Sequence, residues 1–168
     1  EAARQCYQEL LGLDPNRLGA RNRLGMIEMA EGRFDAAEEQ FLAFQYVAPD
    51  LASPYASMGK LMTLLGRYDA AETSLLNALE RKADYCEAHI SLINVYILAI
   101  QPVQAEAASQ RFEEVEPCSW YANWGFFCMV RGLNAMFSGD DAAARRYSAN
   151  CMRLGGSNSV RHRYALAD

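Results

Sequence analysis

Apolar residues recur at three- and four-residue spacing through much of the chain, which is the period of an amphipathic helix. Residues 20–30 and 35–47 both show this spacing, and Gly32 stands between them. A glycine at that point permits the left-handed conformation that ends one helix and starts a tight turn. Asp35, and Asp69 further along, stand where a carboxylate accepts the free N–H groups of a helix start. The pattern therefore predicts pairs of helices joined by short turns.

The helix pairs recur at a fixed interval of 34 residues, and residues 32–41 (GRFDAAEEQF) nearly repeat as residues 66–75 (GRYDAAETSL). Two further series of residues keep this interval: Ala3, Ala37, Ala71 and Ala105, and Leu10, Phe44, Ala78 and Phe112. Pro49 follows Pro15 by one interval, and Pro117 follows Pro49 by two. The prolines follow second helices, which they cannot continue. A single helix pair cannot cover its own apolar face, so neighbouring pairs must cover it. The interval therefore predicts a stacked array.

A 34-residue period with these residue types resembles the tetratricopeptide repeat (TPR) family. In one repeat the pattern is carried by Tyr55, Met58, Gly59, Gly66, Tyr68, Ala71, Leu75 and Ala78. In the preceding repeat it is carried by Leu24, Gly25, Gly32, Phe34, Ala37, Phe41, Phe44 and Pro49. The resemblance implies an all-α fold, in which antiparallel helix pairs stack into a right-handed superhelical solenoid. It is specific for the fold and only weakly specific for function.

In this register residues 1–168 form a single TPR array. Its parts are the second helix of a truncated repeat (1–17), repeats at 18–51 and 52–85, a divergent repeat at 86–119, an altered repeat at 120–157 and the start of a further helix at 158–168. Because the array starts and stops within a repeat, we expect it to be part of a longer chain. The alternative is that the two ends are genuine caps, since terminal repeats are often atypical.

The divergent repeat departs from the family pattern at its tightest positions. Ile93 stands where a small residue is expected, and Ile100 replaces the turn glycine. Pro102 follows and fits the first turn of the next helix. The pattern therefore leaves the conformation of this turn open, and we expect the larger residues to widen the angle between the two helices.

The resemblance also implies where a partner binds, because the first helices of this family line a concave groove that holds a peptide or a helix. Groove-facing positions recur at three- and four-residue spacing. Mapped onto this sequence, the partner-binding residues are Asn22, Arg23, Met26, Met29, Ser57, Lys60, Thr63, Ile90, Asn94 and Ile97. We expect a groove for an extended or helical segment with some acidic character. The alternative is that these residues are only solvent-exposed, and that binding takes place elsewhere.

Residues 118–130 contain both tryptophans of the chain. Trp120, Tyr121 and Trp124 form a possible aromatic interface with a partner or a second copy, because aromatic anchors dominate interface energetics. The alternative is a first helix that adjacent repeats bury on both sides.

Composition narrows the class of partner. Hydrophobic residues make up 51% of the chain, which is enough apolar surface to exclude intrinsic disorder. The formal charge of −5 gives no electrostatic footprint for nucleic acid. No apolar run is long enough for membrane insertion. We therefore expect a protein or peptide partner, with homo-oligomerisation as a further possibility.

The five cysteines are irregularly spaced and include no C-x-x-C pair. Reduced, mostly buried thiols are the simplest interpretation, and they favour a cytoplasmic protein over a periplasmic or secreted one. Cys86 and His89 stand three apart on one helix, but zinc needs four ligands close together, so we expect neither a metal site nor a cofactor.

Catalytic motifs are absent from the sequence: it has no glycine-rich phosphate loop, no H-E-x-x-H and no G-x-S-x-G. We therefore expect no catalytic residues and no enzyme. The expected function is a non-catalytic protein–protein interaction module, acting as a scaffold, an adaptor or an assembly chaperone. The alternatives are a substrate-recognition array of a larger enzyme and a self-association module.

Overall fold

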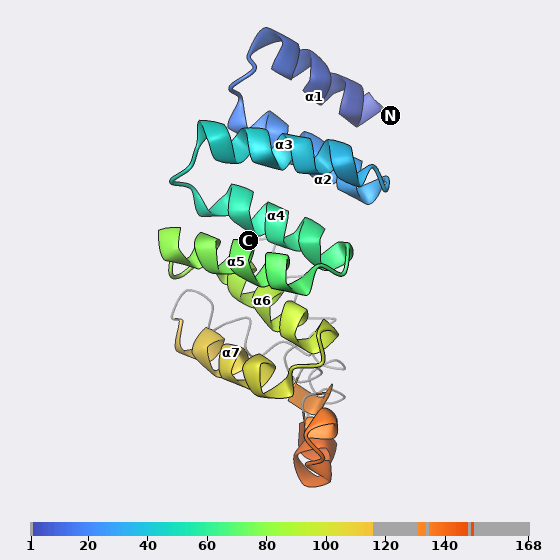
Figure 1. Ribbon diagram of the computed structural model, residues 1–168, viewed down its shortest axis with the longest axis vertical. Coiled ribbons are helices and arrows are strands. Elements are labelled where there is room, and N and C mark those ends of the chain that lie inside the picture. The colour runs from blue at the N-terminus through green and yellow to red at the C-terminus, as the bar shows by residue number, and fades with distance from the viewer. Residues whose placement is uncertain (1, 116–130, 134, 148, 150–168) are drawn as a thin grey trace, which may run out of the picture. The chain divides into compact units, whose positions relative to one another are not determined.

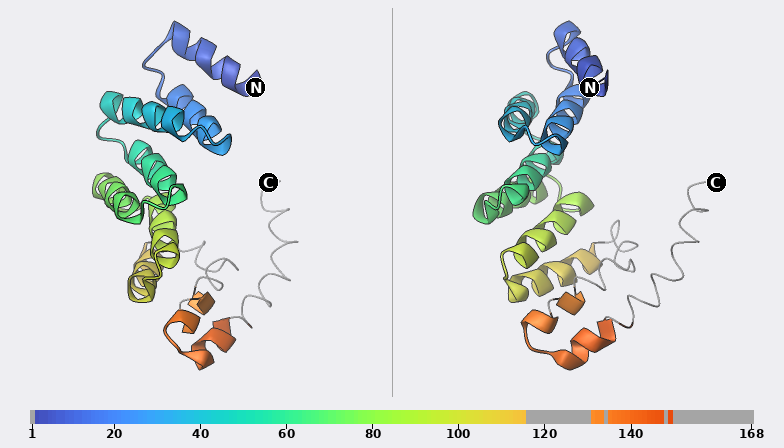
Figure 2. Two further views of the ribbon diagram at one scale, coloured as in Figure 1. Left: turned by 45° about the vertical axis from the view of Figure 1, so that its right-hand side comes forward. Right: turned by 90° about the vertical axis from the view of Figure 1, so that its right-hand side faces the viewer.

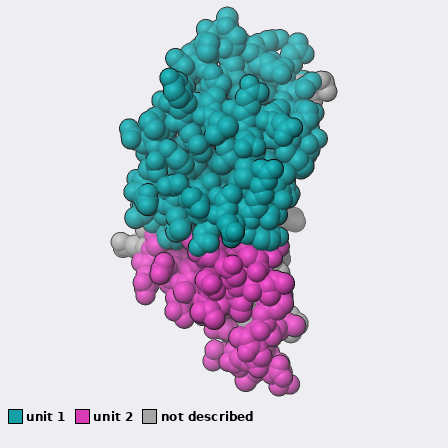
Figure 3. Space-filling model, in the orientation of Figure 1, with its two compact units in different colours: residues 1–91 teal, residues 92–168 magenta. Residues whose placement is uncertain are grey.

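The computed structural model describes residues 2–115, 131–133, 135–147 and 149. Among them the helices are α1 (Ala2–Leu13), α2 (Leu18–Ala30), α3 (Phe34–Val47), α4 (Ala52–Leu64), α5 (Tyr68–Arg81), α6 (Cys86–Leu98) and α7 (Pro102–Glu114). Residues 131–133, 135–137 and 141–147 are also helical, and the described ranges contain no strand. The expected all-α fold class is confirmed. The chain divides into two compact units, unit 1 (residues 1–91) and unit 2 (residues 92–168), shown in Figure 3.

In unit 1 the helices pack as consecutive antiparallel pairs (Figures 1 and 2). Helix α2 packs on α3, and α4 packs on α5, so α2 and α4 are the first helices of their repeats. The pairs stack because α1 contacts α2, α3 contacts α4, and the two first helices also contact each other. Unit 1 is thus a helical solenoid of the kind that the 34-residue interval predicts.

The turn inside each helix pair of unit 1 is built by a glycine in the left-handed region. Gly32 has φ 76° and Gly66 has φ 71°. In the first turn the Gly32 N–H donates to the Met29 carbonyl at 3.2 Å, and the Arg33 N–H donates to the Glu28 carbonyl at 2.9 Å. The second turn repeats both bonds one period later. This Schellman arrangement pairs the last carbonyls of each first helix and reverses the chain direction.

In unit 2 the turn before α7 has the same hydrogen bonds, although isoleucine replaces glycine. The Ile100 N–H donates to the Ile97 carbonyl at 3.0 Å, and the Gln101 N–H donates to the Tyr96 carbonyl at 2.8 Å. Ile100 therefore has φ 57°, a conformation that a β-branched side chain rarely adopts. The conformation of this turn, which the residue pattern left open, is thus the same as in unit 1, and Ile100 carries the strain.

We expect Ile100→Gly to raise the free energy of unfolding by about 1 kcal/mol, because it removes a left-handed β-branched residue. Ile100 is mostly exposed, so its replacement removes little packing. Urea denaturation followed by circular dichroism would measure the change. The matched control is Ala99→Gly, one residue earlier at an ordinary φ, which should lower stability by up to about 1 kcal/mol. Equal losses from both variants would contradict the assignment of strain to Ile100.

The helix pairs of unit 1 approach closely at two glycines. A methyl group added at Gly25 would lie 2.5 Å from Phe41 Cε1, and one added at Gly59 would lie 2.6 Å from Leu75 Cγ. Both distances are far shorter than a carbon–carbon contact, so these positions accept only glycine next to those partners. Phe41 and Leu75 are themselves fully buried.

In unit 2 the equivalent pair of positions has the large residue on the first helix and the small residue on the second, the reverse of unit 1. The register that pairs Gly25 with Phe41 and Gly59 with Leu75 pairs Ile93 on α6 with Ser109 on α7. Ile93 and Ser109 are both fully buried, and Ser109 Oγ donates to the Ala105 carbonyl of its own helix at 2.8 Å. The small serine leaves the space that the glycine leaves elsewhere. Ile93 therefore does not by itself require the wider helix angle that the sequence suggested.

The cysteines differ from the expected set of reduced and buried thiols. Cys6 on α1 is a free thiol, but it is exposed. Cys86, at the start of α6, is disulfide-bonded. The interpretation of Cys86 as a reduced thiol is therefore wrong. Cys118, Cys128 and Cys151 lie outside the described residues.

Candidate functional site

The candidate site is the face of the first helices where the groove residues are expected. Asn22, Arg23, Met26 and Met29 lie on α2, while Ser57, Lys60 and Thr63 lie on α4. Ile90 lies on the part of α6 that belongs to unit 1. Asn94 and Ile97 lie on the part of α6 in unit 2, and both are half-buried. Trp120, Tyr121 and Trp124 of the possible aromatic interface lie outside the described residues.

Two of the expected groove residues bind each other across the first helices. Ser57 Oγ on α4 donates to Asn22 Oδ1 on α2 at 2.8 Å. Ser57 is buried, and so is Ser91 at the equivalent position of α6. Because a buried hydroxyl needs a hydrogen-bond partner, this bond holds α2 and α4 together. Ser57 thus lies between the first helices, while Asn22 is half-buried beside it.

Lys60 has an internal partner as well. Its Nζ donates to Glu87 Oε1, which joins α4 to the start of α6 within unit 1. Tyr85 Oη donates to the other carboxylate oxygen of Glu87 at 2.8 Å. Burial raises the pKa of Glu87, but the bond and charge of Lys60 and the Tyr85 bond outweigh burial, so this pKa is lowered overall. Burial and the Glu87 bond both raise the pKa of Tyr85. The carboxylate therefore stays ionised and keeps Lys60 paired.

The remaining expected side chains of unit 1 are less constrained. Arg23 is exposed and makes no hydrogen bond or ion pair with any residue that the structure describes. Met26 and Met29 are half-buried and unbranched, which lets them adapt to a contact surface. Thr63 is half-buried, and its Oγ1 donates to the Gly59 carbonyl of its own helix at 2.7 Å. Such a surface can bind apolar side chains next to a polar backbone.

Sequence reasoning missed a cluster that fixes the connection between α3 and α4. Arg81 of α5 stacks its guanidinium 3.7 Å from the Tyr55 ring centroid, and its Nε donates to the Pro49 carbonyl at 2.6 Å. Tyr55 Oη donates to the same carbonyl at 3.1 Å. The cluster positions α4, and with it the face that carries Lys60. The feature of the sequence that could have revealed this cluster is Tyr55, which stands six residues after the repeat proline Pro49.

His89 occupies the position equivalent to Tyr55 and has the same role. Its Nε2 lies 2.8 Å from the Ala83 carbonyl, again six residues earlier. Cys86, the other half of the metal pair considered above, is disulfide-bonded. Within the described ranges no three His, Cys, Asp or Glu side chains are grouped so that they could hold a metal ion.

The sequence analysis also did not predict that the carboxylate of Glu28 on α2 is buried. Glu28 is almost fully buried and accepts a hydrogen bond from Arg33 Nε, while Arg33 also bonds Glu31. The bonds to Glu28 and Glu31 raise the pKa of Arg33 above its ordinary value. Glu28 is thus held inside its own turn and is not presented to a ligand.

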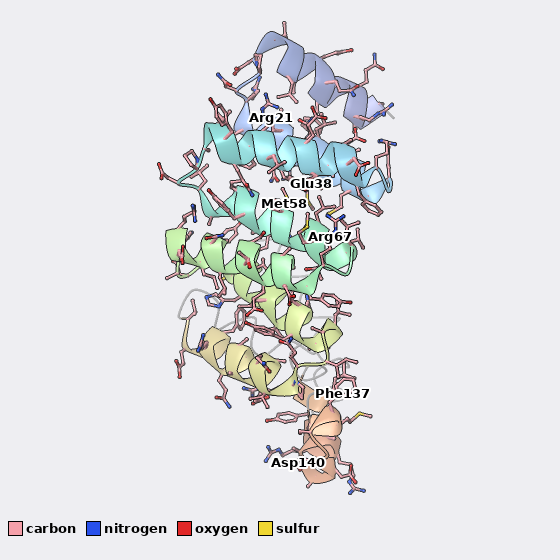
Figure 4. The ribbon with its side chains drawn as sticks, viewed as in Figure 1. Arg21, Glu38, Met58, Arg67, Phe137 and Asp140 are labelled. Carbon is pink, nitrogen blue, oxygen red and sulfur yellow. The ribbon has the colours of Figure 1, made fainter. Side chains whose placement is uncertain are left out.

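Unit 2 contains an open cavity of about 550 Å³ between α7 and the helical residues after 130. Arg131 and Arg146 lie 5.7 and 5.1 Å from the Tyr147 ring centroid, and all three residues line the cavity. Glu106 and Asp140 line it too. Asp140 (Figure 4) caps the helix that follows, since its Oδ1 accepts the Ala143 N–H at 2.9 Å. Two cationic and two anionic side chains in the lining give the cavity no preference for either sign of charge.

Within the described residues, no helix is long and apolar enough to cross a membrane. The stacked helix pairs define the class of protein: an all-α helical repeat protein whose first helices form a candidate binding face. No protein-family model matches the chain, and no curated protein is similar to it. Several solved structures, however, are similar to it.

One such structure is MamA, with 20% sequence identity and a TM-score of 0.76, covering 93% of this chain and 88% of MamA. A second is TTC0263, a thermophilic TPR protein of Thermus thermophilus, with 18% identity, a TM-score of 0.74 and coverage of 98% and 88%. A third is YrrB, a TPR protein with an unusual peptide-binding site, with 14% identity, a TM-score of 0.69 and coverage of 90% and 75%. The chain therefore has a TPR-like fold, as the residue pattern predicts.

Proposed function

We propose that unit 1 binds a protein partner, as an extended peptide or a helix, along the face of α2, α4 and the start of α6. The observation that carries this proposal is that the face bears adaptable side chains that are only partly buried. Met26 and Met29 are half-buried there, while the bonds that set the helix spacing lie beside them at Asn22, Ser57 and Lys60. Because these bonds hold the helices in place, little conformational entropy is lost when the adaptable side chains contact a partner.

The proposed role is non-catalytic: a scaffold, an adaptor or an assembly chaperone. The TPR-like fold supports it, and the similar protein YrrB is a TPR protein with a peptide-binding site. We assign partner contacts to Met26, Met29, Thr63 and Ile90, and a spacing role to Asn22, Ser57 and Lys60. On α6, Asn94 and Ile97 stay candidate contacts.

The test is the double variant Met26→Glu/Met29→Glu, used with the wild type to retain proteins from an extract of the native source. We expect partners identified by mass spectrometry to bind the variant at least tenfold more weakly, since charged side chains then replace two apolar contacts. Circular dichroism should show unchanged helicity, because both side chains are only half-buried.

The matched control is Tyr46→Ser on the second helix α3, where the side chain is 88% exposed. This variant should retain the same partners with unchanged affinity. Loss of the partners from the Tyr46 variant, with the methionine variant still binding, would instead place the binding surface on the second helices.

A further inference from the structure

The two helix turns of unit 2 carry exposed apolar side chains. Ile100 and Val103 at the turn before α7, and Phe137 at the turn before residues 141–147, are each more than half exposed. The two turns are neighbours, because Val103 of one and Ser138 of the other line the same cavity, and Figure 4 shows Phe137 near the start of α7. An apolar surface therefore adjoins the cavity of unit 2.

Two of these side chains stand where unit 1 has other residue types. By the 34-residue interval, Ile100 corresponds to Gly66 and Val103 corresponds to Asp69. Glycine suits the left-handed turn and aspartate suits the start of a helix, whereas Ile100 strains the turn at φ 57° and valine offers no acceptor. Neither side chain is buried within the fold in return, because both are mostly exposed. Exposed apolar residues kept at a cost to the turn indicate a contact made outside the chain.

The charges of the cavity are separated along its length. Asp140 stands at the turn, while Arg146 lies six residues later, about 9 Å further along the helix of residues 141–147. Arg131 lies at the same end as Arg146, because both guanidinium groups are near the Tyr147 ring. The cavity thus has an acidic end at the turn and a basic end away from it.

We propose that this surface docks a second copy of the chain in an antiparallel, two-fold arrangement. Asp140 of each copy then faces Arg146 of the other, which gives two reciprocal ion pairs. Val103, which is 77% exposed at the edge of the cavity, packs against the basic end of the other copy's cavity, near Tyr147. Ile100 extends this apolar contact at the turn. We call Ile100, Val103, Asp140, Arg146 and Tyr147 the docking face.

The charges favour a second copy over another occupant. The chain has a net charge of −5, so two copies repel each other except where their surfaces are locally neutral. The cavity lining is neutral, since its fourth charged residue is Glu106, which accepts a hydrogen bond from Gln110 Nε2 of its own helix at 3.3 Å. A two-fold contact needs a surface that complements itself, and this one has an acidic end, a basic end, a projecting valine and a cavity. A purely acidic or purely basic partner would match only one end.

Sedimentation velocity of the full chain over a range of concentrations tests the proposal. We expect the sedimenting mass to double as the concentration rises, and Val103→Asp to weaken the dimer at least about tenfold. This variant should keep its helicity, because aspartate already stands at the equivalent positions Asp35 and Asp69. The matched control is Leu13→Asp on α1, which also places a charge at an exposed leucine and should leave the dimer unchanged.

The ion pairs have their own test. Asp140→Asn keeps a side-chain oxygen for the helix cap but removes the charge, and it should weaken the dimer at least about threefold. Arg146→Gln should cause a similar loss, and the double variant should lose no more than either single variant, because each removes the same pair. The matched control is Asp141→Asn, which makes the same charge change one residue away, outside the cavity lining, and should leave the dimer unchanged.

Ile100→Gly distinguishes a lost contact from a damaged fold. It removes the strain of the turn and should nevertheless weaken the dimer at least about threefold. The proposal is overturned if the chain stays monomeric up to about 1 mM, or if a dimer forms that tolerates Val103→Asp. The Met26→Glu/Met29→Glu variant should dimerise like the wild type, since the docking face lies in unit 2 and those residues lie in unit 1. A failure of this proposal is therefore separate from a failure of the proposed peptide-binding function.

Discussion

Replacing Phe41 with alanine is expected to lower the free energy of unfolding by about 3–5 kcal/mol, which is the loss typical of a buried aromatic side chain. Phe41 is fully buried on α3, and its ring edge fills the space that Gly25 leaves on α2. Alanine would leave a cavity next to Gly25, which has no side chain to fill it. Urea denaturation followed by circular dichroism measures the change.

The control is Leu42→Ala, one residue further along the same helix and 51% exposed. It should cost well under half as much, because the transfer term is partial and no cavity forms. Similar losses at Phe41 and Leu42 would show that α3 does not pack on α2 in this register.

The second large effect concerns the pair Gly59 and Leu75. Gly59→Ile should cost about 1–3 kcal/mol through overpacking, and Leu75→Ser should cost about 2–5 kcal/mol by removing a fully buried side chain. The double variant reproduces Ile93 and Ser109, the pair found at the equivalent positions of unit 2. We therefore expect it to lose at least about 1 kcal/mol less than the sum of the two single losses.

The matched comparison combines Gly59→Ile with Leu76→Ser, in which the serine replaces a partly exposed leucine next to Leu75. These two losses should add within about 0.5 kcal/mol, because the atoms nearest Gly59 belong to Leu75 and Ala71 and not to Leu76. Additivity in both double variants would mean that positions 59 and 75 do not compensate each other in size.

Much of the fold could be predicted because the repeat interval is visible in the residues. The helices predicted at 20–30 and 35–47 are observed as α2 (Leu18–Ala30) and α3 (Phe34–Val47). The turn at Ile100 could not be predicted, because residue preference disfavours isoleucine there and only the surrounding hydrogen bonds impose the left-handed conformation.

The internal contacts of the candidate site could not be predicted, because register gives a position on a helix and not the neighbours of a side chain. Ser57 and Lys60 were both expected to face a partner, but each bonds a residue of an adjacent helix. Those bonds depend on which residues stand opposite, Asn22 and Glu87, and both lie in other repeats. The disulfide of Cys86 was missed for a similar reason, since irregular spacing along the chain says little about proximity in space.

The reversed sizes of Ile93 and Ser109 have a consequence for how such arrays can be recombined. A chimera that joined α4 to α7 would set glycine against serine and leave a void, while α6 joined to α5 would set isoleucine against leucine. The first and second helices of unlike repeats are therefore not interchangeable parts. The smallest transferable module is the complete helix pair, and a crossover that respects this boundary preserves the fit inside each hairpin.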